Sequence, residues 1–266
     1  HVAIIHDIQG PSNTITCGDA AGYLAFCEAV EMIHRDSADA ALAGAGGTKV
    51  NPIGIVRQYL MGRANCASND NPAMACRPFD ASANGTVFSE AAATLVLEEL
   101  ASANARGAKP LAEPVGWGSS QSLNTDYLHL EPSGQSMQIA IETALQQAGI
   151  GADKIDLVIP FGSGIACDDA AEATGIQNAL GKAAASVPVW PIKGMLGHAG
   201  AAAGAIDLVA ATLAIVHRQC GAAINFQKAA AGCKLNILQK PLRQKFNFVL
   251  CCGYSFGGQS AAVVLK

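Results

Sequence analysis

Short apolar runs alternate with longer Ala-rich segments along this sequence, and the pattern is clearest near its beginning. Residues 14–17 are few and rich in β-branched side chains, which predicts a buried strand. Gly18 interrupts the run, and Asp19 follows at the position of a helix N-cap. From Ala20 to His34 the apolar residues recur near one face with helical spacing. The stretch therefore predicts a strand, a sharp turn and a helix, with the Asp19 carboxylate at the helix N-terminus, where negative charge is favoured.

Similar units follow along the rest of the chain. The segment after residue 37 predicts an apolar strand that ends in a Gly-rich turn at residues 44–47. Further strands are expected at residues 91–97, 111–120, 155–160, 248–252 and 261–265, and further helices at residues 101–109, 133–148 and 199–216. Helical segments between apolar strands are typical of an α/β protein.

An internal repeat divides the chain into two related parts. Phe88-Ser89-Glu90 and a following apolar strand resemble Phe256-Gly257-Gly258 and the strand after them. Each pair is preceded at a similar distance by a turn and an Ala-rich helix, with Asp19 at one turn and His198 at the other. If the two copies pack about a pseudo-twofold axis, Asp19 and His198 occupy equivalent helix starts and converge. We expect a pocket at that junction.

Composition and charge exclude several classes of protein. The chain has 266 residues, half of them hydrophobic and 14% charged, with a net charge of −4 that gives no nucleic-acid footprint. No apolar run reaches the length of about 18 residues that a membrane span needs, and no signal peptide opens the sequence. The nine cysteines lack zinc-ligand spacing and lie mostly in apolar runs, which favours reduced core thiols in a cytoplasmic protein.

Five short motifs carry a resemblance to a known family. They are Gly10-Pro11-Ser12 with the turn at Asp19; Arg77-Pro78-Phe79-Asp80 with Phe88-Ser89-Glu90; Phe161-Gly162-Ser163 with Asp168, Asp169 and Glu172; Lys193 to His198; and Phe256-Gly257-Gly258. Together they resemble the β-ketoacyl synthases, the condensing enzymes of fatty-acid and polyketide synthesis. The resemblance implies a thiolase-like α/β fold of αβαβα layers, with mixed sheets in two pseudo-duplicated halves. Residues 1–104 would be the C-terminal part of the first half, and residues 105–266 the second half.

The sequence departs from this family at two catalytic positions. The family has a nucleophilic Cys where this chain has Asp19, and its first active-site His falls on Phe161. The family's Lys and second His match Lys193 and His198, and its closing Gly-rich turn matches Phe256, Gly257 and Gly258, which the resemblance makes substrate-binding.

The acidic residues of the third motif suggest a metal at first sight. The same acids serve loop structure and helix capping in the family, where Asn-Asp stands at positions 168 and 169, so we expect no metal among Asp168, Asp169 and Glu172. The resemblance implies no cofactor either.

These departures predict a subunit that does not condense acyl chains. A carboxylate is a poor acyl acceptor, because its adduct would be a labile anhydride. The family includes chain-length factors, synthase-like subunits without the nucleophile that pair with an active ketosynthase. Many have Gln at the turn followed by Ala-Gly-Gly, and here Ala20-Ala21-Gly22 follows Asp19. The resemblance thus implies a dimer or heterodimer, with an active ketosynthase subunit, acyl carrier protein and an acyl or polyketide chain as partners.

Two alternatives remain open from the residues. The chain could be a catalytic 3-oxoacyl-acyl carrier protein synthase that uses Cys17, which strand alternation would place on the same face as Asp19. It could also be a decarboxylase or hydrolase of acyl-acyl carrier protein that uses His198 alone. The sequence begins with His1 inside an apolar run, so we expect that roughly the first third of the family chain is missing here.

Overall fold

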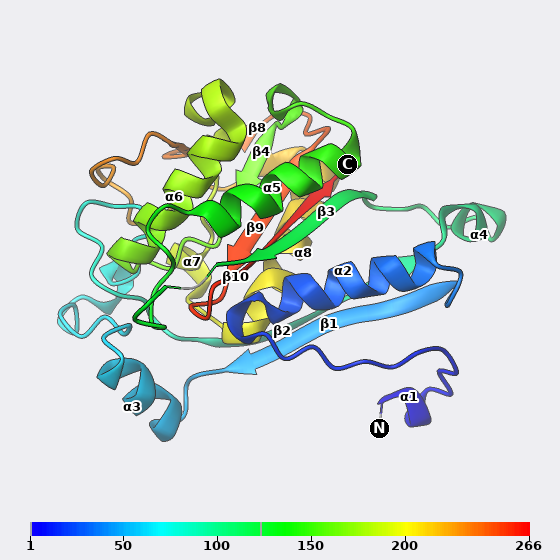
Figure 1. Cartoon of the computed structure of the whole chain (residues 1–266), viewed down its shortest axis with the longest axis horizontal. Coiled ribbons are helices and arrows are strands. Elements are labelled where there is room, and N and C mark those ends of the chain that lie inside the picture. Colours follow the sequence, from blue (N-terminus) through cyan, green and yellow to red (C-terminus); the bar gives the residue numbers. More distant parts are fainter. Residues whose placement is uncertain (1, 123) are drawn as a thin grey trace.

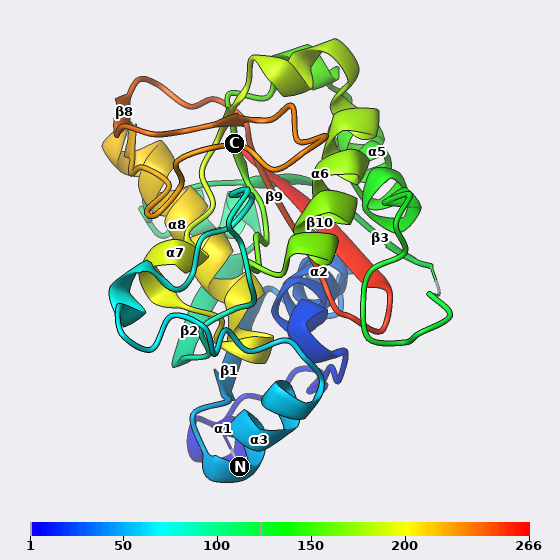
Figure 2. The same cartoon turned by 90° about the vertical axis from the view of Figure 1, so that its left-hand side faces the viewer.

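The computed structural model describes residues 2–122 and 124–266, and four layers of secondary structure are stacked in it (Figure 1). The first layer is an antiparallel two-stranded sheet of β1 (Ala40–Thr48) and β2 (Glu90–Glu98). The second is the pair of helices α2 (Ala21–His34) and α8 (Ala203–His217). The third is a six-stranded sheet, whose far face is covered by α5 (Gln135–Ala148) and α6 (Ala166–Leu180) (Figure 2).

The six-stranded sheet is mixed and has the order β3-β10-β9-β4-β5-β7. Its strands are β3 (Pro114–Gln121), β4 (Leu157–Ile159), β5 (Pro188–Val189), β7 (Asn236–Ile237), β9 (Val249–Tyr254) and β10 (Gln259–Leu265). Along β9, Val249 and Cys251 pack into the core on the α2/α8 side, and Leu250 and Cys252 pack into the core on the α5/α6 side. Both faces of the sheet are therefore buried, which explains why its strands are continuous apolar runs.

Smaller elements connect the layers. They are α1 (Val2–Ile5), α3 (Pro52–Leu60), α4 (Leu100–Ala105), α7 (Lys193–Leu196), the strand pair β6 (Gln219–Cys220) and β8 (Leu242–Arg243), and the 3₁₀ turns η1 (Gly18–Ala20), η2 (Pro72–Met74), η3 (Ala152–Lys154), η4 (Gly181–Ala185) and η5 (Gly200–Ala202). The turns η1 and η5 immediately precede α2 and α8, so both central helices start in the same way.

The helices α2 and α8 cross at a glycine on each. A Cβ atom added to Gly22 would lie 2.8 Å from the backbone nitrogen of Ala205, and one added to Gly204 would lie 2.7 Å from the backbone nitrogen of Tyr23. Such distances are shorter than van der Waals contact, so the two backbones approach each other as closely as they do because both positions lack a side chain. This crossing brings the starts of the two helices, and the residues just before them, together.

The predicted helices and most predicted strands are present, but the strand expected at residues 14–17 is not. That segment has no regular secondary structure and pairs with no strand among the described residues. A β-branched run becomes a strand only when a neighbouring strand binds its backbone groups. The expected Gly-rich turn at residues 44–47 is also wrong, because β1 continues through these glycines to Thr48 with Ala92 and Ala93 opposite Gly46 and Ala45.

Asp19 and His198 do converge, but they are not equivalent positions of the repeat. Asp19 lies in η1, two residues before α2 begins at Ala21, whereas His198 lies five residues before α8 begins at Ala203. Asp19 does not cap the helix either: the N-cap of α2 is Ala20, which makes no side-chain cap hydrogen bond. The pseudo-symmetry thus relates the helices and their glycines, and not the two polar residues.

One helical window, Gly200–His217, is 18 residues long with a mean hydropathy of 1.6, which is enough by length and composition to cross a membrane. The expectation that no apolar run reaches this length is therefore wrong. Half of the window is buried between the two sheets, and its single acid, Asp207, forms an ion pair with Lys193 inside the protein. These contacts are those of a core helix.

The outer face of the two-stranded sheet is exposed in the described chain. Leu42 and Val96 lie opposite each other on this face and are 51% and 69% exposed. The inner face, with Ala43 and Leu95, packs against the α2/α8 layer. The sheet is thus held to the rest of the protein from one side.

The α2/α8 crossing predicts a stability difference between two glycine substitutions. Gly204→Ala should lower the free energy of unfolding by about 1–3 kcal/mol, because the added methyl group collides with Tyr23 although alanine is the better helix former. Gly46→Ala in β1 is the control, since its Cβ atom would meet only Ala92 Cβ at an ordinary 3.6 Å. Denaturant unfolding followed by circular dichroism measures both. Equal stability of the two variants would show that the crossing is not close.

Candidate active site

The contact between Asp19 and His198 lies at the junction of η1 and the segment before α8. Nε2 of His198 is 3.5 Å from Oδ1 of Asp19, and the two side chains are 1% and 4% exposed. This distance is that of an ion pair and is longer than a good hydrogen bond. Nζ of Lys49, at the end of β1, is 4.0 Å from the same carboxylate oxygen. The sequence-predicted pair is therefore brought together in a buried place, with a second cation beside the carboxylate.

The backbone of His198 is held like a short strand. Its N–H donates to the carbonyl of Val87 at 2.8 Å, and its carbonyl accepts from the N–H of Ser89 at 3.0 Å. The preceding Gly197 has φ = 70°, and a Cβ there would lie 2.9 Å from Cβ of Ser89. Only glycine fits this turn without strain. The loop around Ser89 thus fixes the direction of the imidazole.

Phe161 fills the space next to His198. It is fully buried, its ring centroid is 5.1 Å from that of His198, and the two rings meet edge to face at 80°. Nζ of Lys193 lies 4.5 Å from the centroid of the same phenyl ring, which is a cation–π distance. The ring therefore separates the imidazole from the ammonium group with an apolar surface.

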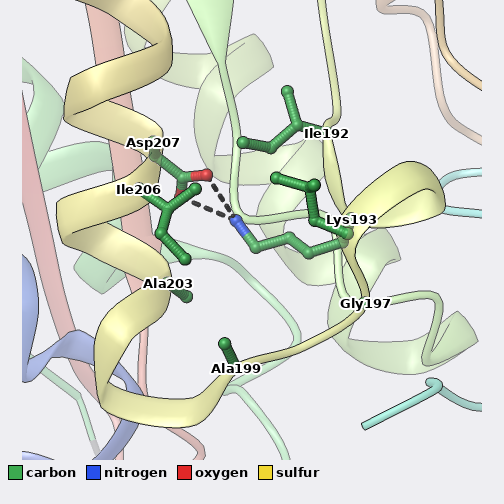
Figure 3. A pocket seen from close by; sticks show the side chains of 8 residues that line it. Ile192, Lys193, Gly197, Ala199, Ala203, Ile206 and Asp207 are labelled. Carbon is green, nitrogen blue, oxygen red and sulfur yellow. Dashed lines mark hydrogen bonds and ion pairs between the residues drawn. The ribbon is translucent and has the colours of Figure 1, made fainter. Parts of the chain in front are cut away.

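Lys193 is bound by an acid that the sequence analysis missed. Its ammonium group donates to both carboxylate oxygens of Asp207 at 2.8 and 2.6 Å, and the hydroxyl group of Tyr23 lies 2.8 Å from Oδ2 of the same residue. Figure 3 shows the pair beside a cavity of about 10 Å³, which is room for about one water molecule. The charge of Lys193 is thus neutralised inside the protein.

The pKa values of the two buried acids move in opposite directions. Burial by itself raises the pKa of Asp19, but the neighbouring His198, Lys49 and Arg63 outweigh it, so the pKa lies below its usual value. Burial is also the largest influence on Asp207, and there it prevails over Lys193 and Tyr23, so the pKa of Asp207 lies above its usual value. The charges around Asp19 therefore favour its ionised form, whereas burial disfavours the ionised form of Asp207, which Lys193 and Tyr23 bind.

The acidic residues of the third motif hold loops. Asp169 accepts from the backbone N–H of Phe79 and from the hydroxyl of Ser163, and Glu172 accepts from the N–H of Phe161 at 2.7 Å. Burial raises the pKa of Asp169 to about 7 and that of Glu172 to about 8. Glu172 binds the backbone N–H of Phe161, and Asp169 binds that of Phe79, so these acids fix the loops that carry the two rings.

The turn at Phe256, Gly257 and Gly258 connects β9 to β10 next to the Asp19 turn. A Cβ atom on Gly18 would lie 2.6 Å from Oγ of Ser255, so the two turns are in contact. Phe256 packs its ring under the guanidinium group of Arg63, with 5.1 Å from Cζ to the ring centroid. All the sequence-predicted site residues therefore lie around one junction.

The geometry limits the chemistry at this junction. Asp19 offers a carboxylate where a thiol would be needed for acyl transfer. Cys17 is only two residues away, but the alternation argument for it is wrong, because residues 14–17 form no strand and Gly18 has φ = 56°. The site as folded holds the carboxylate of Asp19 beside the His198 imidazole and the Lys49 ammonium group, and the carboxylate of Asp207 beside the Lys193 ammonium group.

Three residues of the site escaped sequence analysis. Asp207 was detectable, since it is the single acid in a helix of Gly, Ala and aliphatic residues, and a lone charge on an apolar helix is a sign of a buried partner. Tyr23 and Lys49 carry no comparable signal, because an aromatic residue on a helix and a lysine after a strand are common on any surface.

Two family models match the chain. The β-ketoacyl synthase N-terminal domain matches residues 1–103, and the β-ketoacyl synthase C-terminal domain matches residues 111–227.

Curated relatives agree with these matches. The tetracenomycin polyketide synthase ketoacyl synthase alpha subunit of Streptomyces glaucescens is 36% identical over 97% of this chain and 61% of its own length. The 3-oxoacyl-[acyl-carrier-protein] synthase 2 of Coxiella burnetii is 32% identical over 100% of this chain and 64% of its own length. The chain thus spans about three fifths of the length of the curated relatives that it matches.

Solved structures share the fold. The AntDE:AntF structure, a type II polyketide synthase acyl-carrier protein in complex with its ketosynthase bound to the hexaketide, has a TM-score of 0.95 at 30% identity and covers 100% of this chain and 65% of the other. The ishigamide ketosynthase/chain length factor has a TM-score of 0.85 at 29% identity, over 96% of this chain and 60% of the other. The thiolase-like α/β fold expected from the sequence is confirmed by these neighbours, and the chain belongs to the β-ketoacyl synthase family.

Proposed function

We propose that this chain is part of a non-condensing, ketosynthase-like subunit of the chain-length-factor type, which pairs with an active β-ketoacyl synthase in polyketide or fatty-acid synthesis. The observation that carries the proposal is the buried contact between Asp19 and His198. It occupies the position where the family has a nucleophilic Cys with an imidazole beside it.

The chemistry of this contact opposes acyl transfer. The depressed pKa of Asp19 means that the group is an anion at neutral pH, and an acyl carboxylate anhydride formed on it would hydrolyse rather than wait for a second substrate. Nε2 of His198 faces this anion at 3.5 Å, so the imidazole is directed at Asp19 rather than at an incoming acyl group. The contact with Asp19 therefore occupies the one imidazole that the site contains.

Phe161 removes a second requirement of condensation. An oxyanion or enolate needs hydrogen-bond donors aimed at it, and a phenyl ring offers none. Lys193 is engaged elsewhere, because its ammonium group donates to both carboxylate oxygens of Asp207. Lys193 and His198 thus match the family's motif, but their contacts leave no hydrogen-bond donors aimed at an oxyanion or enolate.

The proposed partners are an active ketosynthase subunit, acyl carrier protein and the acyl or polyketide chain. One structural neighbour is a ketosynthase with its acyl-carrier protein, and another is a ketosynthase/chain length factor. These neighbours support the same binding partners for this chain. The first residues expose apolar side chains, with Ile4 81% and Ile5 76% exposed, as a surface that meets another subunit would. A cytoplasmic location follows from these partners.

A catalytic synthase with an atypical site is the second candidate. The curated relatives favour it, because they are named as ketoacyl synthases, including the alpha subunit of the tetracenomycin system. Such an enzyme would need Cys17, which is half-buried and free, as its nucleophile.

Acyl labelling separates the two candidates. The purified protein, incubated with radiolabelled acyl-acyl carrier protein, should retain no covalent label above background, because the Asp19 site forms no stable acyl adduct. A Cys-containing ketosynthase is the positive control. In an assay reconstituted with a ketosynthase partner, Cys17→Ala should leave the product yield unchanged, as should the exposed-cysteine control Cys66→Ala. Label that disappears with Cys17→Ala alone would establish the atypical synthase instead.

Restoring the thiol tests the account of Phe161. Asp19→Cys should remain below roughly one hundredth of the condensing rate of an active ketosynthase, because general acid–base groups contribute about 10²–10⁴-fold and Phe161 still occupies one imidazole position. The double variant Asp19→Cys/Phe161→His is the matched comparison. A working enzyme from the single change would show that Phe161 does not block the reaction.

Pairing is the remaining expectation. Co-expressed with a catalytic ketosynthase subunit, the complete protein should elute from size exclusion as a stable heterodimer, whereas Ile4→Asp/Ile5→Asp should weaken the complex by about tenfold or more if these exposed residues are buried in it. The matched control Leu111→Asp changes an exposed apolar residue elsewhere. A protein that stays monomeric with the ketosynthase present would remove the pairing from the proposal.

A further inference from the structure

A cluster of three different metal-ligand side chains lies outside the Asp19 site. Nδ1 of His129, in the loop before α5, is 3.2 Å from Sγ of Cys167 and 3.2 Å from Oδ1 of Asp168. Cys167 and Asp168 are in the first turn of α6. The three ligand atoms all lie within 4.8 Å of one another, so they enclose one small volume.

Protons satisfy this arrangement only in part, because a proton on Nδ1 serves Asp168 well and the Cys167 sulfur poorly. If Nδ1 of His129 accepts the Cys167 thiol proton, its lone pair also faces the carboxylate oxygen of Asp168. If Nδ1 instead carries a proton and donates it to Asp168, it cannot accept from the thiol. A hydrogen-bonded network therefore leaves one of the two contacts weak, whereas a single cation would bind all three atoms together.

The two separations from Nδ1 of His129 are close to those of a zinc site. Bond lengths of about 2.3 Å to sulfur, 2.0–2.1 Å to nitrogen and 2.0–2.2 Å to oxygen, at tetrahedral angles, place sulfur and nitrogen about 3.6 Å apart and nitrogen and oxygen about 3.3 Å apart. The His129–Asp168 separation already has this value, and the His129–Cys167 separation must lengthen by a few tenths of an ångström. Cys167 is exposed and can make that adjustment by rotating.

The protein holds Asp168 in place for this role. The residue is fully buried, its Oδ1 accepts from the N–H of Leu130 at 3.0 Å, and its Oδ2 pairs with Nη1 of Arg63 at 2.9 Å. Arg63 works against a cation, but it binds the other oxygen, and a thiolate and a carboxylate together supply two negative charges. His129 is 26% exposed, which gives an ion and a water ligand a path from solvent.

We propose that His129, Cys167 and Asp168 bind one Zn²⁺ ion, with water as the fourth ligand. Binding converts the Cys167 thiol to a thiolate and releases its proton to solvent, with no change of oxidation state. Asp169 and Glu172 are not members of this cluster, and their carboxylates hold the backbones of Phe79 and Phe161.

A bound ion would tie the loop of His129 to α6 beside Arg63. Nη1 of Arg63 also donates to the carbonyl of Leu128 at 2.6 Å, and its guanidinium group covers the ring of Phe256. The ion would therefore reduce the mobility of Arg63 and of the Phe256 turn that packs against it. This consequence does not depend on whether the subunit condenses acyl chains.

Metal titration of the complete, chelator-treated protein tests the site. Zn²⁺ should bind with a stoichiometry of one per chain, and Co²⁺ should give a thiolate charge-transfer band together with the intense visible bands of four-coordination. Cys167→Ser should abolish the charge-transfer band, and Cys167→Ser and His129→Ala should each weaken Zn²⁺ binding by more than about tenfold. Cys66→Ser, at another exposed cysteine, should change neither measurement.

Folding of the variants is checked by circular dichroism, and both substituted side chains are accessible enough to be removed without opening the core. Asp168 is left unchanged, because its removal would strand Arg63 in the interior. The proposal is overturned if no saturable binding of one ion per chain is found. It is equally overturned if Zn²⁺ binding survives in both ligand variants, or if bound Co²⁺ shows no thiolate band.

Discussion

The close crossing of α2 and α8 is the contact on which the candidate site depends. Gly22 and Gly204 let the two backbones touch, and the two turns that precede the helices then meet at one point. A larger residue at either glycine would separate Asp19 from His198 and Tyr23 from Asp207, because each pair has one member on each side of the crossing. The Ala-rich composition of both helices is thus a requirement of the site as well as of the packing.

Charge in this interior is neutralised in pairs. Asp19 faces His198, and Lys193 faces Asp207, with the Phe161 ring between the imidazole and the ammonium group. Breaking one partner of such a buried pair costs about 3–5 kcal/mol, because the other charge stays behind in a medium that solvates it poorly. Asp19 is therefore part of a charge-balanced core, with His198 and Lys49 beside its carboxylate.

The sequence was sufficient for the helices, for most strands and for the meeting of Asp19 with His198, because periodicity and a repeated unit are local signals. The strand predicted at residues 14–17 is absent, because a strand forms only beside a neighbouring strand, and the hydrophobic pattern does not show whether such a neighbour exists. The sequence also failed for Asp207 and Tyr23, since the pairing of a lysine with an acid 14 residues later is decided by the route of the chain. The His129 cluster was beyond reach for the same reason, as its members are 38 residues apart.

The two sheets differ in how they are covered, and this bears on the order in which the protein folds. The six-stranded sheet has helices on both faces, so it can bury its apolar surface with residues of the second half and α2. The β1/β2 ribbon gains its buried surface only on the side of α2 and α8 within the described residues, and it leaves Leu42 and Val96 in water. A two-stranded ribbon is marginal by itself. The ribbon is therefore a late-docking, early-opening unit, and amide exchange in the native state should begin there while the larger sheet stays closed.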